Sequence, residues 1–219
     1  MSDFIVHTVP GSPFGRCALV ALEEKGARYR VVPVAPGSMK AEPHLARHAF
    51  GRVPVLEHGD FVLYETQAIL RYLDRLLPRP TLTPADPQSA ARMDQVMNVN
   101  DWYLFQGVCS VITFQRIVLP RLLGGVTDEA AIAAAMPKAH QVFNELSRLL
   151  ASKPYFAGDT FSLADIMVGS QLDMFPQLPE WQPLTAANPN LVAWLKRVAA
   201  RPSFAATTWE RVVAMAQAA

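Results

Sequence analysis

The sequence predicts two domains, a small mixed α/β domain followed by an all-helical one. Strand and helix patterns alternate over the first 78 residues, a stretch with four prolines in eleven residues follows (LPRPTLTPADP), and no strand alternation appears after it. We therefore expect domains at residues 1–78 and 88–219, joined by a linker at 79–87. A chain of 219 residues is long enough for two domains of unequal size.

The first domain opens with a short apolar strand, FIVHTV, and then a helix that follows the turn PGSP. Gly26 ends that helix, because glycine adopts the left-handed conformation of a C-cap without strain. A second strand (RYRVVPVA), a loop segment and a hairpin (PVLE, the turn HGD, FVLY) come next. The helix ETQAILRYLDRLL completes the domain with its apolar residues on one face. The predicted order is β-α-β, a loop segment, and β-β-α.

The second domain is predicted to be a helical bundle. A long helix runs through Met93 towards Leu123, and GGVTDEA interrupts it. Thr127 is the predicted N-cap of the next helix, with two acidic residues in the first turn, where the helix dipole favours them. Pro137 lies inside that helix and predicts a kink.

A later segment, DTFSLADI, has the spacing of a capping box between Ser162 and Asp165. Phe161 and Ile166 stand where a hydrophobic staple would place them. We interpret the segment as a folding element without a catalytic role. Loss of the Ser162 cap should cost about 1 kcal/mol.

Composition narrows the classes of function. Half of the residues (51%) are hydrophobic and the net charge is only +1, so no overall field favours nucleic acid or an anionic membrane as a partner. The segment MSDFIVHTV lacks the features of a signal peptide, and the longest uncharged runs are too short to span a bilayer. Two cysteines, Cys17 and Cys109, make no disulfide framework, so we expect a reducing, cytoplasmic setting.

Pro54 stands at the predicted start of a strand, where it removes one hydrogen-bond donor from the sheet. A cis peptide there would turn the backbone of Val53 outwards, so that its N–H and C=O could pair with an extended ligand. A trans proline at an ordinary strand start is the alternative, and base rates favour it.

Two helix starts in the first domain carry small hydroxyl residues. Ser12 lies between Gly11 and Pro13 before the first helix, and Thr66 follows Glu65 before another. Each hydroxyl could simply cap its helix, but the free N–H groups at a helix start also bind anions. Both helix starts and the strand-opening proline fall in one small α/β domain, where ligands gather at loops along one edge of the sheet.

Four segments together resemble the successive signatures of the cytosolic glutathione transferases, most closely the serine-type, phi-like group and its bacterial relatives. These segments are SPFGRCALVALEEKG, EPHLARHAFGRVPVLEHGDFVLYETQAILRYL, YFAGDTFSLADI and NPNLVAWLKRVAARPSF. The resemblance covers essentially the whole chain. It implies a thioredoxin-like N-terminal domain of order β-α-β-α-β-β-α and an all-α C-terminal helical bundle. A homodimer is also expected from this resemblance.

The resemblance also implies a role for each site residue. Ser12 would stabilise the thiolate of glutathione, the cosubstrate, and no metal is implied. The residues that would bind glutathione are Val53 and Pro54 with Pro54 cis, Glu65, Thr66, Arg52 and Lys40. Met39 stands where phi-like relatives often have histidine, so the contact to the glycyl carboxylate is open. The residues expected to line the pocket of the hydrophobic second substrate are Phe14, Tyr103 and Phe114.

Ser12 is the hydroxyl in the catalytic region. Transferases of this family use serine, tyrosine or cysteine there, but the first tyrosine is Tyr29 and Cys17 stands five residues too late. We expect Cys17 to be buried and inert. Thr8 lies earlier, within the strand, and is a weaker candidate for the catalytic hydroxyl. A hydroxyl hydrogen bond and the positive end of the helix dipole together can stabilise a thiolate.

Three functions stay open after these considerations. The leading one is an enzyme that conjugates glutathione to an electrophilic centre of a hydrophobic small molecule. A second keeps the site but catalyses glutathione-dependent isomerisation or peroxide reduction, and a third is a non-catalytic interaction module. His44 and His48 have the spacing of two metal ligands, but no third ligand lies near them, so we expect no metal site.

Overall fold

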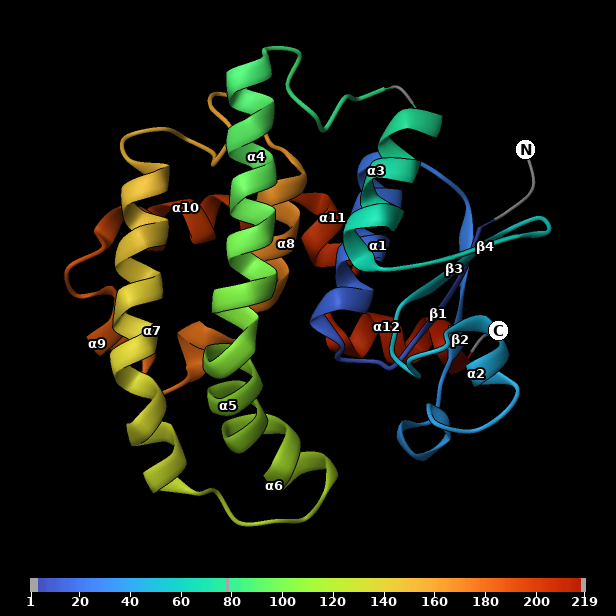
Figure 1. Cartoon of the computed structure of the whole chain (residues 1–219), viewed down its shortest axis with the longest axis horizontal. Helices are drawn as coiled ribbons and strands as arrows, with labels where there is room; N and C mark the ends of the chain where they lie inside the picture. Colours follow the sequence, from blue (N-terminus) through green and yellow to red (C-terminus); the bar gives the residue numbers. More distant parts are fainter. Residues whose placement is uncertain (1–3, 78, 218–219) are drawn as a thin grey trace. The chain divides into compact units, whose positions relative to one another are not determined.

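The computed structural model describes residues 4–77 and 79–217, which form two compact units (Figure 1). The first unit holds the chain up to Leu82 together with the chain from Ala200 onward, and the second is Thr83–Ala199. The last residues therefore group with the α/β unit, although the predicted helical domain included them. Arg201 explains this, since its guanidinium binds the carboxylate of Glu24 in the first unit through two hydrogen bonds of 2.7 and 2.8 Å.

The first unit is built on a four-stranded mixed sheet. Its strands are β1 (Phe4–Thr8), β2 (Tyr29–Pro33), β3 (Val55–His58) and β4 (Phe61–Tyr64), in the order β2-β1-β3-β4. Strand β1 pairs with β2 in parallel and with β3 in the antiparallel sense, and β3 and β4 form an antiparallel hairpin. The connection from β3 to β4 is two residues long, one shorter than predicted, because His58 belongs to the strand and pairs with Phe61.

Helices of the first unit come from both ends of the sequence. They are α1 (Pro13–Glu24), the 3₁₀ turn η1 (Pro36–Ser38), α2 (His44–Arg47), α3 (Thr66–Leu76), α11 (Pro202–Ala206) and α12 (Trp209–Gln217). Helices α1 and α3 pack together, and the apolar side chains of α1 from Cys17 to Leu22 are fully buried. Gly26 follows α1 with a φ of +59°, as predicted for its C-terminus. The thioredoxin-like order β-α-β-α-β-β-α is confirmed.

The second unit is all-helical, as predicted. Its elements are α4 (Pro87–Val99), the π-helical segment η2 (Asn100–Cys109), α5 (Ser110–Thr113), the π-helical segment η3 (Phe114–Val118), α6 (Leu119–Leu122), α7 (Glu129–Leu150), α8 (Leu163–Leu172), η4 (Phe175–Gln177), α9 (Trp181–Thr185) and α10 (Pro189–Ala199). Helix α8 is buried along its whole length. In this unit α4 packs against α8, and α10 packs against both α7 and α8 (Figure 1).

The prediction of one long helix through Met93 towards Leu123 is wrong in its middle. Gln106 has a ψ of 111° and Gly107 a φ of +83°, so the helical path breaks there. The break has hydrogen-bond partners of its own: Lys138 donates to the carbonyl of Gln106, and the N–H of Gly107 donates to the hydroxyl of Ser110 at 3.0 Å. These contacts replace helical hydrogen bonds, so the break is stable.

Asp128, and not Thr127, is the N-cap of α7. The carboxylate of Asp128 accepts a hydrogen bond from the N–H of Ala131 at 3.0 Å. The hydroxyl of Thr127 instead donates to the carbonyl of Gln115 at 2.9 Å, an acceptor that no local pattern reveals. Pro137 lies inside α7 as predicted, and a kink at that point stays a prediction.

The capping box at α8 is confirmed. One carboxylate oxygen of Asp165 accepts hydrogen bonds from the N–H and the hydroxyl of Ser162, at 3.0 and 2.7 Å. The other accepts from the N–H of Phe156 at 3.0 Å and from the indole of Trp194 at 2.8 Å. Because all four donors and the acceptor are buried, Asp165 ties three segments of the second unit together.

The run Pro87–Leu122 is the one described helical stretch that is long and apolar enough to cross a membrane by length and composition alone. Core helices of soluble proteins meet the same test. This run is broken at Gln106 and Gly107, and its first part packs against α8.

Candidate functional site

Ser12 is presented by a tight turn between β1 and α1. The N–H of Ser12 donates to the carbonyl of Val9 at 2.9 Å, which closes a four-residue β-turn. Pro10 occupies the second position of this turn, and Gly11 the third with a φ of +88°. This pattern is that of a type II turn, in which proline sets the second position and glycine tolerates the third. The local sequence VPGS therefore directs the chain from the strand into the helix start.

The hydroxyl of Ser12 is an N-cap in this structure. Its oxygen accepts a hydrogen bond from the N–H of Gly15 at 3.1 Å, and Pro13 is the first residue of α1. A hydroxyl has two lone pairs and one hydrogen, so accepting from the backbone leaves its hydrogen available. Among the described residues, none accepts that hydrogen. Capping and donation to a ligand are thus compatible at this one atom.

Gly15 allows α1 to approach the end of β1. A Cβ on this residue would lie 1.8 Å from the hydroxyl oxygen of Thr8, which is an impossible contact. Gly15 was not among the predicted site residues, and its only sequence signal is its place in the first turn of the helix. Thr8 itself is buried, which excludes it as the exposed catalytic hydroxyl.

The Val53–Pro54 peptide is cis, as the resemblance to the transferases implies, although base rates favoured trans. Pro54 is buried and stands directly before β3, while Val53 is half-buried. No residue that the structure describes is a hydrogen-bond partner of the Val53 N–H or C=O. Two unpaired backbone groups beside a strand are what an extended peptide ligand requires.

Thr66 is the first residue of α3 and not its N-cap, so that prediction is wrong. Glu65 holds the cap position with a φ of +72° and a ψ of 115°, and no side chain caps the helix. A non-glycine residue with this φ is strained, and such residues are concentrated at functional sites. Since Glu65 is exposed and the first N–H groups of α3 have no side-chain cap, this helix start can receive an anionic group.

Lys40 and Arg52 differ in their present contacts. The ammonium of Lys40 donates to the carbonyl of Phe50 at 2.6 Å, so in this structure it holds the loop before β3. Arg52 has an exposed side chain, and within the described part of the chain its guanidinium has no partner. Of the two cations, Arg52 is the one whose donors are available.

His44 and His48 are structural in this conformation. His44 contributes its Nε2 to a hydrogen bond with the carbonyl of Arg52 at 2.8 Å, and His48 accepts from the N–H of Phe50 through Nδ1 at 3.3 Å. The His48 ring also stacks on Tyr64, with ring centroids 4.3 Å apart. Within the described residues no group of three potential ligands could hold a metal ion. The two histidines hold the loop that leads to Val53.

Both cysteines are buried. The thiol of Cys17 donates to the carbonyl of Pro13 at 3.2 Å, inside α1. Burial raises the pKa of the Cys109 thiol far above its usual range. Neither sulfur has the exposure of a nucleophile.

The sheet register brings three of the predicted site segments to one edge. His7 pairs with Val55 and Val55 pairs with Tyr64, so the end of β1, the start of β3 and the end of β4 are level with one another. After β1 the chain continues to Ser12. Val53 lies just before β3, and Glu65 follows β4. Three segments that are far apart in the sequence therefore meet at the same edge of the sheet.

The predicted pocket aromatics fall in different units. Phe14 is half-buried on α1 in the first unit. Tyr103 and Phe114 belong to the second unit, where their side chains are 56% and 37% exposed. Their assignment to a shared pocket stays a prediction.

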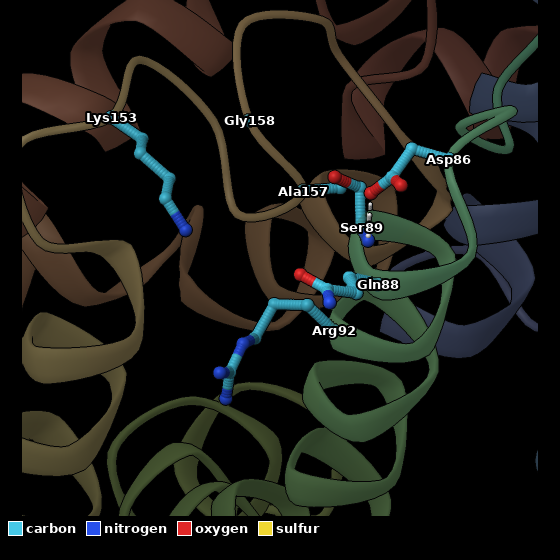
Figure 2. Close-up of a pocket in the computed structure, with 7 residues that line it drawn as sticks. All are labelled: Asp86, Gln88, Ser89, Arg92, Lys153, Ala157 and Gly158. Carbon is cyan, nitrogen blue, oxygen red and sulfur yellow. Dashed lines mark hydrogen bonds between the residues drawn. The ribbon is translucent and has the colours of Figure 1, made fainter.

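A pocket of about 200 Å³ lies elsewhere, at the start of α4 in the second unit (Figure 2). It is lined by Asp86, Gln88, Ser89, Arg92, Lys153, Ala157 and Gly158. The carboxylate of Asp86 accepts a hydrogen bond from the N–H of Ser89 at 2.8 Å and so caps α4. None of the predicted site residues lines this polar pocket, and it is distinct from the sheet edge described above.

The fold and the arrangement of the predicted site segments define a class: a thioredoxin-like unit with these segments at one sheet edge, joined to a helical unit. Models of known protein families support this class. The N-terminal domain model of glutathione S-transferases matches residues 2–75, and the C-terminal domain model matches residues 106–202.

Individual relatives agree with the family models. Glutathione S-transferase 3 of Zea mays is 34% identical over 215 residues, covering 94% of each chain. The crystal structure of glutathione transferase F7 from Populus trichocarpa has a TM-score of 0.84 and 26% identity, covering 97% of this chain and 99% of that one. The structure of glutathione S-transferase-I bound with lactoylglutathione has a TM-score of 0.83 and 29% identity, with coverages of 98% and 100%. The chain belongs to the glutathione S-transferase family, and it resembles the phi-class members.

Proposed function

We propose that this chain conjugates the thiolate of reduced glutathione to an electrophilic centre of a hydrophobic small molecule, with Ser12 as the catalytic residue. One observation carries this proposal. The Ser12 oxygen caps α1 by accepting from Gly15, so the hydroxyl hydrogen is left for a sulfur at the positive end of the helix.

The energetic requirement is modest. A free thiol has a pKa of about 8.5, so only a few per cent is ionised at neutral pH. Lowering that pKa by about two units requires about 2.7 kcal/mol of preference for the anion. A charge-assisted hydrogen bond contributes about 1.5–3 kcal/mol, and the helix dipole about 0.3–1 kcal/mol. One hydroxyl at a helix start is sufficient, and the proton leaves to water.

The other site residues would hold the tripeptide. Val53, preceding the cis Pro54, offers its two unpaired backbone groups to the cysteinyl residue. The exposed carboxylate of Glu65 would bind the γ-glutamyl ammonium. Thr66 and the uncapped N–H groups of α3 would bind the γ-glutamyl carboxylate. Arg52 is the better placed partner for the remaining carboxylate, since Lys40 would first have to release the carbonyl of Phe50.

The second substrate would lie against Phe14, Tyr103 and Phe114. Aromatic side chains bind an apolar electrophile without competing for the thiolate. We assign the helical domain, residues 88–219 in the predicted division, to this pocket, with residues 79–87 as the linker from the glutathione-binding domain at 1–78. A cytoplasmic detoxification role fits such a pair of substrates.

A homodimer is part of the proposal. The exposed aromatic side chains of Phe50 and Trp102, each 62% exposed, are available for a protein contact. Sedimentation at micromolar concentration would give twice the mass of the 24.1 kDa chain, and a monomer at all concentrations would contradict a dimer.

The central experiment compares substitutions of Ser12. Ser12→Gly removes the hydroxyl but costs the helix start only a few tenths of a kcal/mol, whereas Ser12→Ala costs about 1 kcal/mol. For both we expect the pKa of bound glutathione, followed by thiolate absorbance, to rise by about one to two units. At neutral pH kcat/KM should fall about 10- to 100-fold.

Ser162→Ala is the matched control, because it removes a cap from a helix of the other unit. It should lower stability by about 1 kcal/mol and leave the thiolate unchanged. An unchanged thiolate pKa in both Ser12 variants would contradict the role of Ser12.

Two other functions would give different results. A non-catalytic module would not turn over any electrophile, and calorimetry would show weak or no glutathione binding. An isomerase or peroxidase would bind glutathione but act on a hydroperoxide or an isomerisable substrate in preference to electrophiles. A panel of both substrate types therefore separates the three.

A further inference from the structure

The C-terminal residues of the first unit lie against the turn that presents Ser12. A Cβ built on Gly11 would be 2.9 Å from Cδ2 of the Trp209 indole and 3.0 Å from both Cε2 and Cε3. A point nearly equidistant from these three bonded ring atoms lies above the ring plane and not at its edge. The face of the Trp209 indole therefore lies against one side of Gly11, the exposed residue immediately before Ser12.

Trp209 is held there by contacts of the preceding segment with α1. Arg16 in the first turn of α1 donates to the carbonyl of Phe204 at 3.0 Å, and its guanidinium lies 5.0 Å from the centre of the Phe204 ring. At the other end of α1, Glu24 binds Arg201 through two hydrogen bonds and the hydroxyl of Ser203 at 2.6 Å. Helix α11 is thus fastened along α1 at two points.

Helix α12 starts from this anchored segment. Trp209 is its first residue, and the N–H of Val212 donates to the carbonyl of Thr208 at 2.9 Å to begin the helix. Further along, α12 packs against β2, where the hydroxyl of Tyr29 lies 3.8 Å from the sulfur of Met215. The indole is consequently fixed at both sides, by α11 before it and by α12 after it.

The contact with the indole face supports the turn at Gly11. The residue has a φ of +88°, and the space that a side chain would occupy is filled by the ring. The Val9–Ser12 hydrogen bond closes the turn between β1 and α1, and the indole ring packs against the glycine inside that turn. The hydroxyl of Ser12 must point at a sulfur within hydrogen-bond distance, and a small misplacement of such a group lowers the rate strongly.

We propose that Trp209 is a positioning residue for the reaction: its indole holds the Pro10–Gly11 turn, and so places the Ser12 hydroxyl against the glutathione sulfur. This inference rests on the proposed function of Ser12. It predicts that an element near the C-terminus of the chain influences the ionisation of a ligand bound at the start of α1.

The test measures the pKa of bound glutathione in Trp209→Ala, Trp209→Leu and Trp209→Phe. In the alanine and leucine variants we expect the pKa to rise by about 0.5–1 unit, kcat at neutral pH to fall about three- to tenfold, and KM for glutathione to change less than about twofold. Phenylalanine keeps a flat ring over Gly11, so it should restore most of kcat. The leucine variant keeps apolar volume, so it tests the inference if the alanine variant does not fold.

Val212→Ala is the matched control in the same helix. Val212 is buried in α12, and the three atoms nearest to a Cβ on Gly11 all belong to Trp209, so truncating Val212 loosens the helix without removing the ring. We expect the thiolate pKa of this variant to remain at the wild-type value. A shift equal to that of Trp209→Ala would mean that helix docking alone is responsible, and would overturn the inference.

A double variant distinguishes the inference from the proposed function. If Trp209 acts through Ser12, adding Trp209→Ala to Ser12→Ala should not raise the thiolate pKa further. If Ser12→Ala alone leaves the pKa unchanged, the proposed function fails. If Ser12→Ala raises the pKa and the alanine and leucine variants of Trp209 do not, only the inference about Trp209 fails.

Discussion

A hydroxyl at a helix start can serve the fold and a ligand at once. Ser12 accepts from the N–H of Gly15, and this contact uses a lone pair of the oxygen while the hydrogen stays available. Cap and catalyst are therefore not competing explanations of Ser12. A buried acid shows the opposite case: Asp165 uses both carboxylate oxygens for four internal hydrogen bonds and has no capacity left for a ligand.

The capping box gives a prediction at the residue scale. Asp165→Ala leaves the buried donors of Phe156, Ser162 and Trp194 without an acceptor, so it should lower the free energy of unfolding by at least about 3 kcal/mol. Ser162→Ala removes one cap and should cost about 1 kcal/mol. Urea unfolding of the two variants measures the difference, and equal losses would contradict the central role of the carboxylate.

Local patterns predicted whole elements better than the points where elements end. Periodicity and turn residues predicted the strands, the hairpin, the helices and the capping box of α8. The predictions were wrong at Thr127 and Thr66, and at the break after Gln106. In two of these cases a partner distant in the sequence determines the local structure. The carbonyl of Gln115 accepts a hydrogen bond from the Thr127 hydroxyl, and Lys138 donates one to the carbonyl of Gln106. Local propensity contains no information about such partners.

At the element scale, the contact between α1 and α11 should depend on pH. Burial raises the pKa of Glu24, but the hydrogen bonds from Arg201 and Ser203 and the charge of Arg201 lower it more, so the net pKa lies below 4.5. A lowered pKa in the folded state stabilises the fold above the unfolded pKa, and this stabilisation is lost as the pH falls through the folded value.

The variant Glu24→Gln tests this dependence. Near neutral pH it should lower the free energy of unfolding by about 1–3 kcal/mol, because a hydrogen-bonded carboxylate is replaced by a neutral amide. As the pH falls below 4.5, the difference from the wild type should shrink, and unfolding curves at several pH values measure it. A difference that is independent of pH would show that the charge of Glu24 does not stabilise the contact.

On the scale of the whole molecule, the two compact units are not two consecutive halves of the sequence. The chain leaves the first unit after Leu82 and returns to it at Ala200. Leu82 is itself anchored there, since its N–H donates to Asp74 at 2.9 Å, and Asp74 forms a buried ion pair with Lys25 at 2.6 Å. The predicted linker at 79–87 was placed by its prolines, which cannot reveal that its first part is held by a buried charge pair.

Removing the chain after Ala199 tests this division. Because α11 and α12 contact α1 and β2, we expect hydrogen exchange to become at least about tenfold faster in those two elements. Helices α7 and α8 of the second unit should keep their protection. Loss of protection in α7 and α8, with α1 unchanged, would instead place the C-terminal residues in the helical domain.

The amino-acid sequence alone was enough for the order of elements, the all-helical second part and the family resemblance. It was enough because hydrophobic period, turn chemistry and cap spacing are local properties of the chain. The tertiary structure alone decided that Ser12, Val53 and Glu65 reach one sheet edge, and that the Trp209 indole lies against Gly11. Strand register and the return of the chain at Ala200 bring these residues together, and both depend on contacts between segments that are distant in the sequence.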